Sequence, residues 1–198
     1  MTEAKIKTVA ITGANGFIGK ALVRYFSNSG WNVVAFVHEN PLNRVDGVQY
    51  VQFDLLHAEG AELSGVDVLV HTAYQPILTK NTSPNPNLVG TKVLAEKAQK
   101  LGVKVVYFST LSAHDKAESI YGITKLEMEK YFDPTSDLIL RFGLVLGEGG
   151  GLYGKIRGII QKSAIVPLIG GEMPIQTIAL EDVCRIVESG INKELSGV

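Results

Sequence analysis

Tyr121 and Lys125 form a pair of side chains whose types and spacing suggest acid–base chemistry. If their segment is helical, the two residues lie one turn apart on the same face. A tyrosine hydroxyl titrates near about 10, which is too high for efficient proton transfer at neutral pH. A neighbouring ammonium group favours the phenolate and lowers that pKa. The pair therefore suggests a tyrosine acid or base tuned by a lysine, although an ordinary helix surface can show the same spacing.

A second chemical signal is a glycine-rich segment near the start of the chain, Thr-Gly-Ala-Asn-Gly-Phe-Ile-Gly, between an apolar run and a helical pattern. Gly13 allows a tight turn, Gly16 lets the backbone approach a pyrophosphate, and Gly19 lets the helix pack closely on the strand. The amides of Phe17 and Ile18 would face the pyrophosphate at the positive end of the helix. This placement favours dinucleotide binding over a purely structural turn.

The rest of the chain supplies the elements that must position these residues. Short apolar runs alternate with segments of helical period, which is typical of βαβ units around a parallel sheet. The predicted strands span residues 7–11, 31–37, 48–53, 66–70, 103–108 and 138–142. The predicted helices span residues 17–29, 88–98, 119–132, 152–163 and 181–189. We expect an α/β fold with a doubly wound, Rossmann-type parallel sheet over 1–146, and a small loop-rich C-terminal region over 147–198 on the same domain.

The composition excludes several classes of function. The chain has 198 residues, of which 45% are apolar and 20% charged, so it is neither disordered nor fibrous. A net charge of −1 gives no bulk electrostatic case for nucleic acid or anionic membranes. Cys184 is the single cysteine and is expected in the core, and the four histidines lack metal-ligand spacing. No apolar signal segment precedes the glycines and no Gly-x-Ser-x-Gly elbow occurs. We expect a soluble, cytoplasmic protein without a metal, nucleic-acid or membrane partner.

The glycine spacing resembles that of the short-chain dehydrogenase/reductase superfamily, in its extended and atypical branches, which include the NAD-dependent epimerase/dehydratase-like proteins. Further motifs in the family's order extend the resemblance over nearly the whole chain: Phe53-Asp54-Leu55, Val70-His71-Thr72-Ala73, Asn87-Leu88-Val89-Gly90-Thr91, Ser109-Thr110, Tyr121-x-x-x-Lys125, Arg141-Phe142-Gly143 and Ile178-Ala179-Leu180-Glu181-Asp182-Val183. The resemblance implies an NAD(P)-dependent oxidoreductase or epimerase. Such an enzyme exchanges hydride between nicotinamide and a hydroxyl or carbonyl carbon of a small-molecule substrate.

The resemblance also assigns roles to single residues. It implies Tyr121 as the acid/base, Lys125 as its pKa tuner and the anchor of the nicotinamide ribose, and Thr110, rather than Ser109, as the donor to the substrate oxygen. The residues that it assigns to the cofactor are Gly13, Asn15, Gly16, Phe17, Ile18, Gly19, His38, Asp54, Leu55, Thr72, Ala73, Lys125, Phe142 and Gly143. Asp54 would meet the adenine amine, and its alternative role is that of a turn residue at a strand end.

The end of the second predicted strand bears on the choice between NAD and NADP. An acidic residue there accepts from the ribose 2′-hydroxyl, whereas a basic residue favours a 2′-phosphate. His38 stands where many NADP-preferring relatives carry arginine, Glu39 follows one residue later, and Arg44 could also reach. We expect NADP, with NAD as the alternative. A solvated loop histidine is the alternative role of His38.

Two departures from the extended pattern keep a rival function open. The stretch from Ser109 to Tyr121 is short and looks more like the atypical branch, which includes the nucleotide-binding accessory subunit of respiratory complex I. The sequence also ends at Val198, before the usual substrate lobe, so either it is part of a longer chain or the lobe is minimal. Either explanation of the early end disfavours a sugar-nucleotide substrate. The rival is a non-catalytic NAD(P)H-binding sensor or assembly protein, and the family also makes a homodimer possible.

Charged residues follow the Tyr121–Lys125 pair along the same predicted helix. Glu127, Glu129 and Lys130 are most simply interpreted as a solvated helix face. Lys125 and Glu129 could add an ion pair four residues apart.

Overall fold

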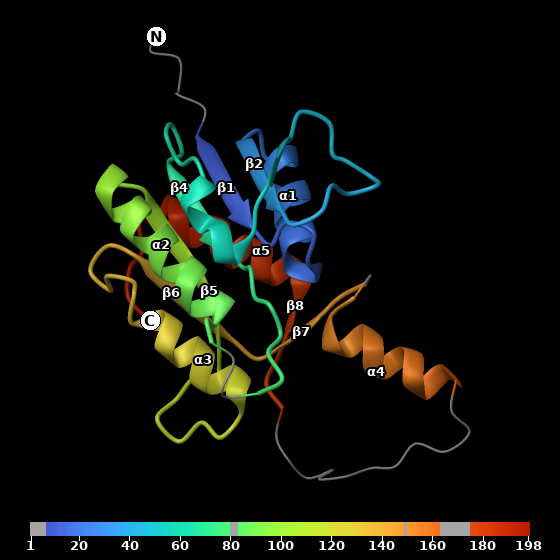
Figure 1. The fold of residues 1–198 in the computed structure, drawn as a ribbon. Helices are drawn as coiled ribbons and strands as arrows, with labels where there is room; N and C mark the ends of the chain where they lie inside the picture. The colour runs from blue at the N-terminus through green and yellow to red at the C-terminus, as the bar shows by residue number, and fades with distance from the viewer. Residues whose placement is uncertain (1–6, 80–82, 149, 163–174) are drawn as a thin grey trace.

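A six-stranded parallel sheet forms the centre of the computed structural model, which describes residues 7–79, 83–148, 150–162 and 175–198 (Figure 1). The strands are β1 (Thr8–Thr12), β2 (Asn32–Val37), β3 (Gln49–Gln52), β4 (Val68–His71), β5 (Lys104–Thr110) and β6 (Leu138–Phe142). They lie in the order β3-β2-β1-β4-β5-β6, and each neighbouring pair is parallel. The order reverses between β1 and β4, and ligands of doubly wound sheets bind outside the carboxyl ends of the strands at that point.

Helices cover both faces of the sheet. They are α1 (Phe17–Asn28), α2 (Pro86–Leu101), α3 (Ile120–Glu129), α4 (Gly151–Lys162) and α5 (Leu180–Asn192). Successive strand residues point to opposite faces, so Val9 and Ile11 pack with α1 and α5, while Ala10 packs with α2 and α3. Figure 1 shows α2 and α3 in front of the sheet and α5 behind it. The predicted doubly wound, Rossmann-type fold is confirmed.

Three short elements add to those predicted from the sequence. One is a 3-10 helix, η1 (Leu55–Gly60), which follows β3. The other two are β7 (Leu144–Leu146) and β8 (Thr177–Ala179), which pair in parallel as a separate small sheet. Strands of three residues are too short for an alternating pattern to be recognised, and the partner of β7 lies far along the chain.

The C-terminal region contributes a core helix as well as loops. Val183 and Val187 of α5 are fully buried beside α1, and the Tyr25 hydroxyl donates to Glu188 at 2.7 Å.

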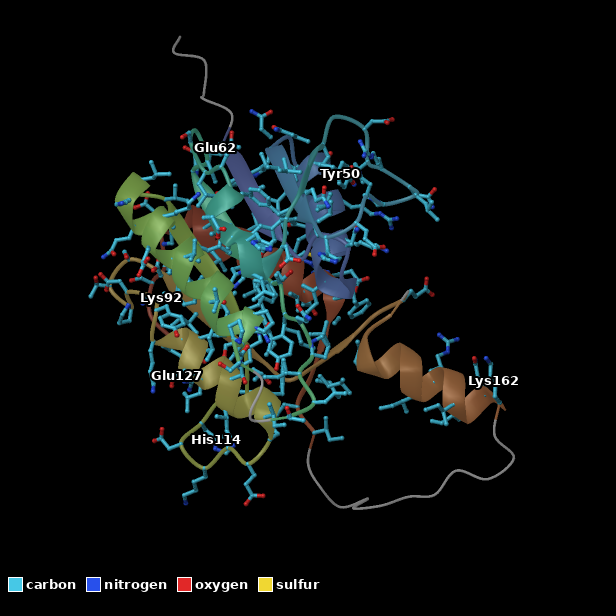
Figure 2. All side chains as sticks on the ribbon, in the orientation of Figure 1. Tyr50, Glu62, Lys92, His114, Glu127 and Lys162 are labelled. Carbon is cyan, nitrogen blue, oxygen red and sulfur yellow. The ribbon has the colours of Figure 1, made fainter. Side chains whose placement is uncertain are left out.

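Helix α4 lies apart from the main sheet, and Figure 2 places Lys162 at its outer end. Residues 163–174, which belong to the predicted loop-rich C-terminal region, lie outside the described residues. The division at residue 146 stays a prediction. None of the described helices is long and apolar enough to cross a membrane.

Candidate functional site

The glycine loop connects β1 to α1 and lies against the residues that follow β4. Gly13 has a φ of +67°, and a Cβ there would come within 2.8 Å of the Ala73 backbone. A Cβ on Gly19 would come within 2.2 Å of the Gly13 carbonyl oxygen. A side chain at Gly13 would force the loop away from the segment after β4, and a side chain at Gly19 would force the loop and α1 apart. These two glycines therefore have the turn and packing roles expected from the sequence.

The N-terminus of α1 is open to an anionic group. The helix begins at Phe17 after Gly16, no side chain caps this end, and its first turn contains no acidic residue. Uncapped N–H groups and the positive end of the helix dipole attract anions. A Cβ on Gly16 would meet one atom within 4 Å, the Gly13 carbonyl oxygen at 3.0 Å. Gly16 can therefore take a side chain with modest strain, unlike Gly13 and Gly19.

A cavity of about 570 Å³ lies beside this loop at the reversal point of the sheet. Among the predicted cofactor residues, those that line it are Gly13, Asn15, Gly16, His38, Asp54, Leu55, Thr72 and Ala73. Its other lining residues, which are not among the predicted cofactor residues, are Phe36, Phe53, Leu56, Tyr74, Gln75 and Pro76. The structure thus brings the glycine loop together with the ends of β2, β3 and β4. The walls are mainly apolar with a few polar groups, as in most small-molecule sites.

His38 and Asp54 face each other at one end of this cavity. The His38 Nδ1 lies 3.4 Å from an Asp54 carboxylate oxygen, and the His38 side chain is 74% exposed. The other oxygen of Asp54 accepts from the Leu56 N–H at 2.7 Å and so caps η1. Asp54 therefore does serve as a turn residue, and its side chain also reaches the cavity. Arg44, which donates to Asn40 at 2.8 Å, does not line this cavity.

Buried polar contacts fix the loop that follows β4. His71 is fully buried between two hydroxyls, Thr12 Oγ1 at 2.6 Å from Nδ1 and Thr91 Oγ1 at 2.9 Å from Nε2. Burial, with the nearby charge of Lys125, lowers the pKa of His71 to about 3, so the ring is neutral. The Asn87 amide exchanges two hydrogen bonds with the Gln75 backbone, at 2.7 and 2.8 Å. These contacts hold one wall of the cavity in place.

The remaining predicted cofactor residues lie outside this cavity. Phe17 and Ile18 are partly buried against the core in the first turn of α1. The Phe142 ring packs on Phe108 with centroids 5.3 Å apart. A Cβ on Gly143 would come within 2.2 Å of the Gln176 carbonyl oxygen, so this glycine lets β7 approach β8.

Helix α3 presents Tyr121 beside the end of β5. Ser119 caps the helix by accepting from the Gly122 N–H at 3.0 Å. A Cβ on Gly122 would lie 2.3 Å from the Ser112 carbonyl oxygen, so the helix starts close to the loop after β5. Tyr121 is 42% exposed. Burial of its hydroxyl and the nearby Tyr74 raise the pKa of Tyr121, and a hydrogen bond with Thr110 works in the opposite direction.

Lys125 is buried on the same face, with an exposed fraction of 3%. Its Nζ donates to the Phe108 carbonyl at 2.6 Å and lies over the rings of Tyr107 and Tyr74, at 4.8 and 5.3 Å from their centroids. Burial lowers the pKa of Lys125 to about 7, against an opposing effect of Glu129. Burial sets the upward direction of the Tyr121 pKa here, and the tuning of Tyr121 by Lys125 stays a prediction.

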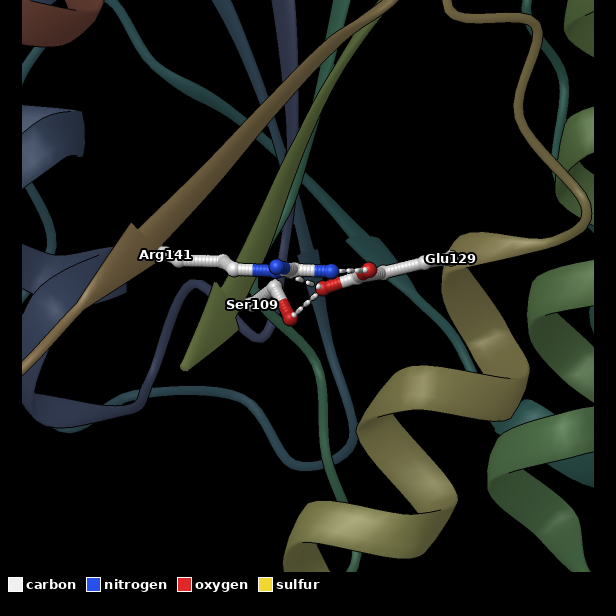
Figure 3. Close-up of polar contacts among 3 residues, drawn as sticks. All are labelled: Ser109, Glu129 and Arg141. Carbon is white, nitrogen blue, oxygen red and sulfur yellow. Dashed lines mark hydrogen bonds and ion pairs between the residues drawn. The ribbon is translucent and has the colours of Figure 1, made fainter. Parts of the chain in front are cut away.

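The interpretation of Glu129 as part of a solvated helix face is wrong. Glu129 is 7% exposed, and its carboxylate receives Arg141 from β6 and the Ser109 hydroxyl from β5 (Figure 3). Glu127 does lie on the exposed side of α3 (Figure 2), where it forms an ion pair at 2.6 Å with the exposed Lys130 at the end of the helix. The Ser109 hydroxyl is bound to Glu129, whereas the Thr110 hydroxyl forms a hydrogen bond with Tyr121, and the role of Thr110 as donor to the substrate oxygen stays a prediction.

Metal ligation receives no support from the part of the chain that the structure describes. No group of three or more histidine, cysteine or acidic residues is placed to hold a metal ion there. Cys184 is buried in the core, and burial raises the pKa of its thiol to about 11. It therefore stays protonated and apolar at neutral pH.

Comparison with known proteins assigns this geometry to a family. Residues 9–149 match the family model described as "NAD dependent epimerase/dehydratase family". Ceramide reductase of Caulobacter vibrioides is 28% identical over 185 residues, which cover 88% of this chain and 57% of the reductase. The 2-alkyl-3-oxoalkanoate reductase of Shewanella oneidensis is 31% identical over 129 residues, 62% of this chain and 33% of that protein. The chain thus spans less than two thirds of the length of each of these two relatives.

Solved structures show the same fold. The NAD-dependent NDP-hexosamine 5,6-dehydratase TunA, involved in tunicamycin biosynthesis, matches with a TM-score of 0.78 at 22% identity, over 97% of this chain and 74% of its own. MoeE5, in complex with UDP-glucuronic acid and NAD, matches with a TM-score of 0.73 at 26% identity, over 91% of this chain and 71% of its own.

Proposed function

Because the chain belongs to the NAD dependent epimerase/dehydratase family, we propose that it binds a nicotinamide dinucleotide and catalyses oxidation, reduction or epimerisation at a hydroxyl-bearing or carbonyl carbon. The observation that carries the proposal is the position of Tyr74. This residue lines the cavity beside the glycine loop, packs edge-on against Tyr121 with centroids 5.0 Å apart, and covers Lys125. The nucleotide-sized cavity and the acid–base pair are therefore neighbours.

The dinucleotide fits the chain's own features at the carboxyl edge of the sheet. The open N-terminus of α1, with the amides of Phe17 and Ile18, would hold the pyrophosphate. The adenosine half would lie among Asn15, His38, Asp54 and Leu55, and the second ribose and nicotinamide would lie near Thr72, Ala73, Lys125, Phe142 and Gly143. The bound nucleotide would supply hydride exchange.

The acid–base work falls to three side chains. Tyr121 would give its proton to a substrate carbonyl oxygen during reduction, and would accept the proton of a substrate hydroxyl during oxidation. Thr110 would donate a hydrogen bond to the same oxygen. Lys125 would hold the nucleotide ribose and, once charged, favour the phenolate of Tyr121.

Carbonyl reduction is the reaction that we propose to test first. Two of the curated relatives are named as reductases, a ceramide reductase and a 2-alkyl-3-oxoalkanoate reductase, while a third is named as a cobyric acid synthase. A panel of 3-oxoacyl compounds, simple ketones and sugar nucleotides therefore suits the first assays.

Dinucleotide binding is tested most directly at Gly16. We expect Gly16→Val to weaken the affinity for NAD(H) and NADP(H) by at least about tenfold, because its side chain would stand between the backbone and the pyrophosphate. Gly158→Val in α4 is the matched control, since a Cβ at Gly158 meets nothing within 4 Å. Calorimetric titration gives the affinities and thermal denaturation checks the fold. No binding of either nucleotide by the unmodified chain would overturn the proposal.

NADP is the nucleotide that we propose, with NAD as the alternative. His38 lines the cavity at the end of β2, and Lys20 and Arg24 line a second hollow of about 330 Å³ that shares Asn15 with it. These groups can attract a 2′-phosphate, whereas Glu39 follows His38 and MoeE5 holds NAD.

His38 should hold a 2′-phosphate through a ring N–H, in competition with its pairing to Asp54. We expect His38→Ala to weaken the affinity for NADP(H) more than the affinity for NAD(H), and His114→Ala, on an exposed loop away from β2 (Figure 2), to change neither. Calorimetric titration of each variant with both nucleotides measures the effect, and equal or tighter binding of NAD than of NADP by the unmodified protein contradicts the assignment.

One observation favours the rival, a nucleotide-binding protein without turnover. Lys125 is held by the Phe108 carbonyl and covered by Tyr74, so its amine is not exposed to a ligand in this structure. An enzyme needs Tyr74 to move aside, whereas a sensor does not. Tight nucleotide binding with no turnover across the panel would favour the rival.

A further inference from the structure

Glu129 joins three elements around the proposed site through one buried carboxylate. Its Oε1 accepts from Arg141 Nε at 2.9 Å and from the Ser109 hydroxyl, and its Oε2 accepts from Arg141 Nη2 at 2.5 Å (Figure 3). Ser109 belongs to β5 and Arg141 to β6, while Glu129 is the last residue of α3. The two parallel contacts with the guanidinium fix the direction of the carboxylate as well as its position.

Each member of this cluster lies next to a proposed site residue. Glu129 follows Lys125 by one turn of α3, and Lys125 follows Tyr121 by another. Ser109 precedes Thr110 in β5, and Arg141 precedes Phe142 in β6. The cluster therefore connects the helix that carries the acid–base pair to both strands whose ends complete the site.

Stability alone is a weak reason for burying such a cluster. Desolvation of a carboxylate and a guanidinium offsets most of their attraction, and apolar side chains of similar volume often serve as well or better. Lys125 and Glu129 are the two charged residues counted as buried in the described part of the chain, and both lie on the same face of α3. Their positions on one face of the helix suggest that the Glu129 carboxylate serves the Lys125 amine.

We propose that Glu129 is a positioning residue for the Tyr121–Lys125 pair, and that Ser109 and Arg141 fix its carboxylate one helical turn from the Lys125 amine. This inference rests on the proposed function in one respect, the role of Lys125 as ribose anchor and tuner of Tyr121. The geometry of the cluster is independent of any ligand.

The charges around Lys125 give the expected consequence. The groups around its amine are Tyr107 from β5, Tyr74 from the loop after β4, neutral His71 from β4, Glu129 from α3 and, paired with Glu129, Arg141 from β6. Tyr121 lies one turn before Lys125 on α3. Burial lowers the pKa of Lys125 to about 7 and the Glu129 carboxylate opposes that effect. Removing the carboxylate charge should therefore move the titration of Lys125 to lower pH, and leave less ammonium at neutral pH.

Glu129→Gln tests this directly, with Glu127→Gln on the exposed side of α3 as the matched control. The readout is the titration of the Lys125 amine, followed by NMR of the side-chain carbon next to the nitrogen in the nucleotide-free protein, with the signal assigned from Lys125→Met. We expect Glu129→Gln to lower the midpoint by about one pH unit, within the range for loss of a neighbouring opposite charge. Glu127→Gln should leave it within a few tenths of the unmodified protein.

Two more variants keep the test decisive if Glu129→Gln fails to fold. Glu129→Asp keeps the negative charge, so the titration midpoint of Lys125 should stay close to that of the unmodified protein. Ser109→Ala removes one hydrogen bond and leaves the Arg141 pair, and should lower the midpoint by a smaller amount.

The pH dependence of NADP(H) affinity should shift with the midpoint. If folded variants leave the midpoint unchanged, the inference is overturned even where nucleotide binds. If the midpoint shifts and no nucleotide binds, the proposed function fails and the inference about Glu129 stands.

Discussion

Replacement of Tyr121 by phenylalanine is expected to lower turnover by about 10²- to 10⁴-fold, the usual contribution of a positioned acid or base. The substitution removes the hydroxyl that lies beside Thr110 and keeps the ring that packs edge-on against Tyr74. The fold and the nucleotide affinity should therefore change little. Since the lost group serves the substrate oxygen, the effect should fall on kcat more than on nucleotide binding.

The measurement follows nicotinamide absorbance with the substrate panel, and product analysis detects epimerisation without net oxidation or reduction. Tyr131→Phe is a suitable control, because Tyr131 follows the same helix but lines a separate hollow at the opposite edge of the sheet, with Lys104 and Asp137. Turnover equal to that of the unmodified protein would show that Tyr121 is a structural residue and that the mechanism is wrong.

The fold could be predicted from the sequence because its signals are local. Buried parallel strands appear as continuous apolar runs, and glycines placed between a strand and a helix mark the loop at the start of the sheet. The role of Gly19 depends on Gly13 and Ala14, a few residues away in the chain. The role of Gly13 depends on Thr72 and Ala73 after β4, the strand that lies beside β1 in a doubly wound sheet. For the same reason, the ends of β2, β3 and β4 could be expected to meet at one cavity.

The residues that the sequence did not reveal depend on distant contacts. Glu129 has the spacing of a helix surface, and its burial comes from Arg141 and Ser109 on two strands. Tyr74 stands in a loop with no periodic pattern, and its contacts arise only when α3 packs beside that loop. A buried glutamate on the helix face of a Tyr-x-x-x-Lys pair could have been suspected from its spacing of four residues after the lysine. Nothing local indicated that Tyr74 connects the cavity to the pair.

Lys125→Met is expected to lower both turnover and nucleotide affinity, and to stabilise the folded protein near neutral pH. Turnover should fall by at least about 10²-fold and nucleotide affinity by about tenfold, because the ammonium is proposed to hold the ribose and to tune Tyr121. Lys130→Met is the matched control, since Lys130 is exposed and paired with Glu127. Nucleotide affinity and turnover that both match the unmodified protein would show that Lys125 has no part in the site.

The stability of Lys125→Met distinguishes a functional lysine from a structural one. Burial lowers the pKa of Lys125 from 10.5 to about 7, so between these values the unfolded chain binds more protons than the folded chain. This group therefore makes the folded protein less stable at neutral pH, and its contribution rises as the pH increases toward 10.5. Methionine has no such dependence, although it loses the hydrogen bond to the Phe108 carbonyl. The melting temperature of Lys125→Met relative to the unmodified protein should thus be highest near neutral pH and fall as the pH rises. The opposite result is a Lys125→Met variant that melts below the unmodified protein by the same amount at every pH. That result would show that the Lys125 amine is charged and paired in the folded protein, and it would contradict a lysine that lowers stability but is kept for its chemistry.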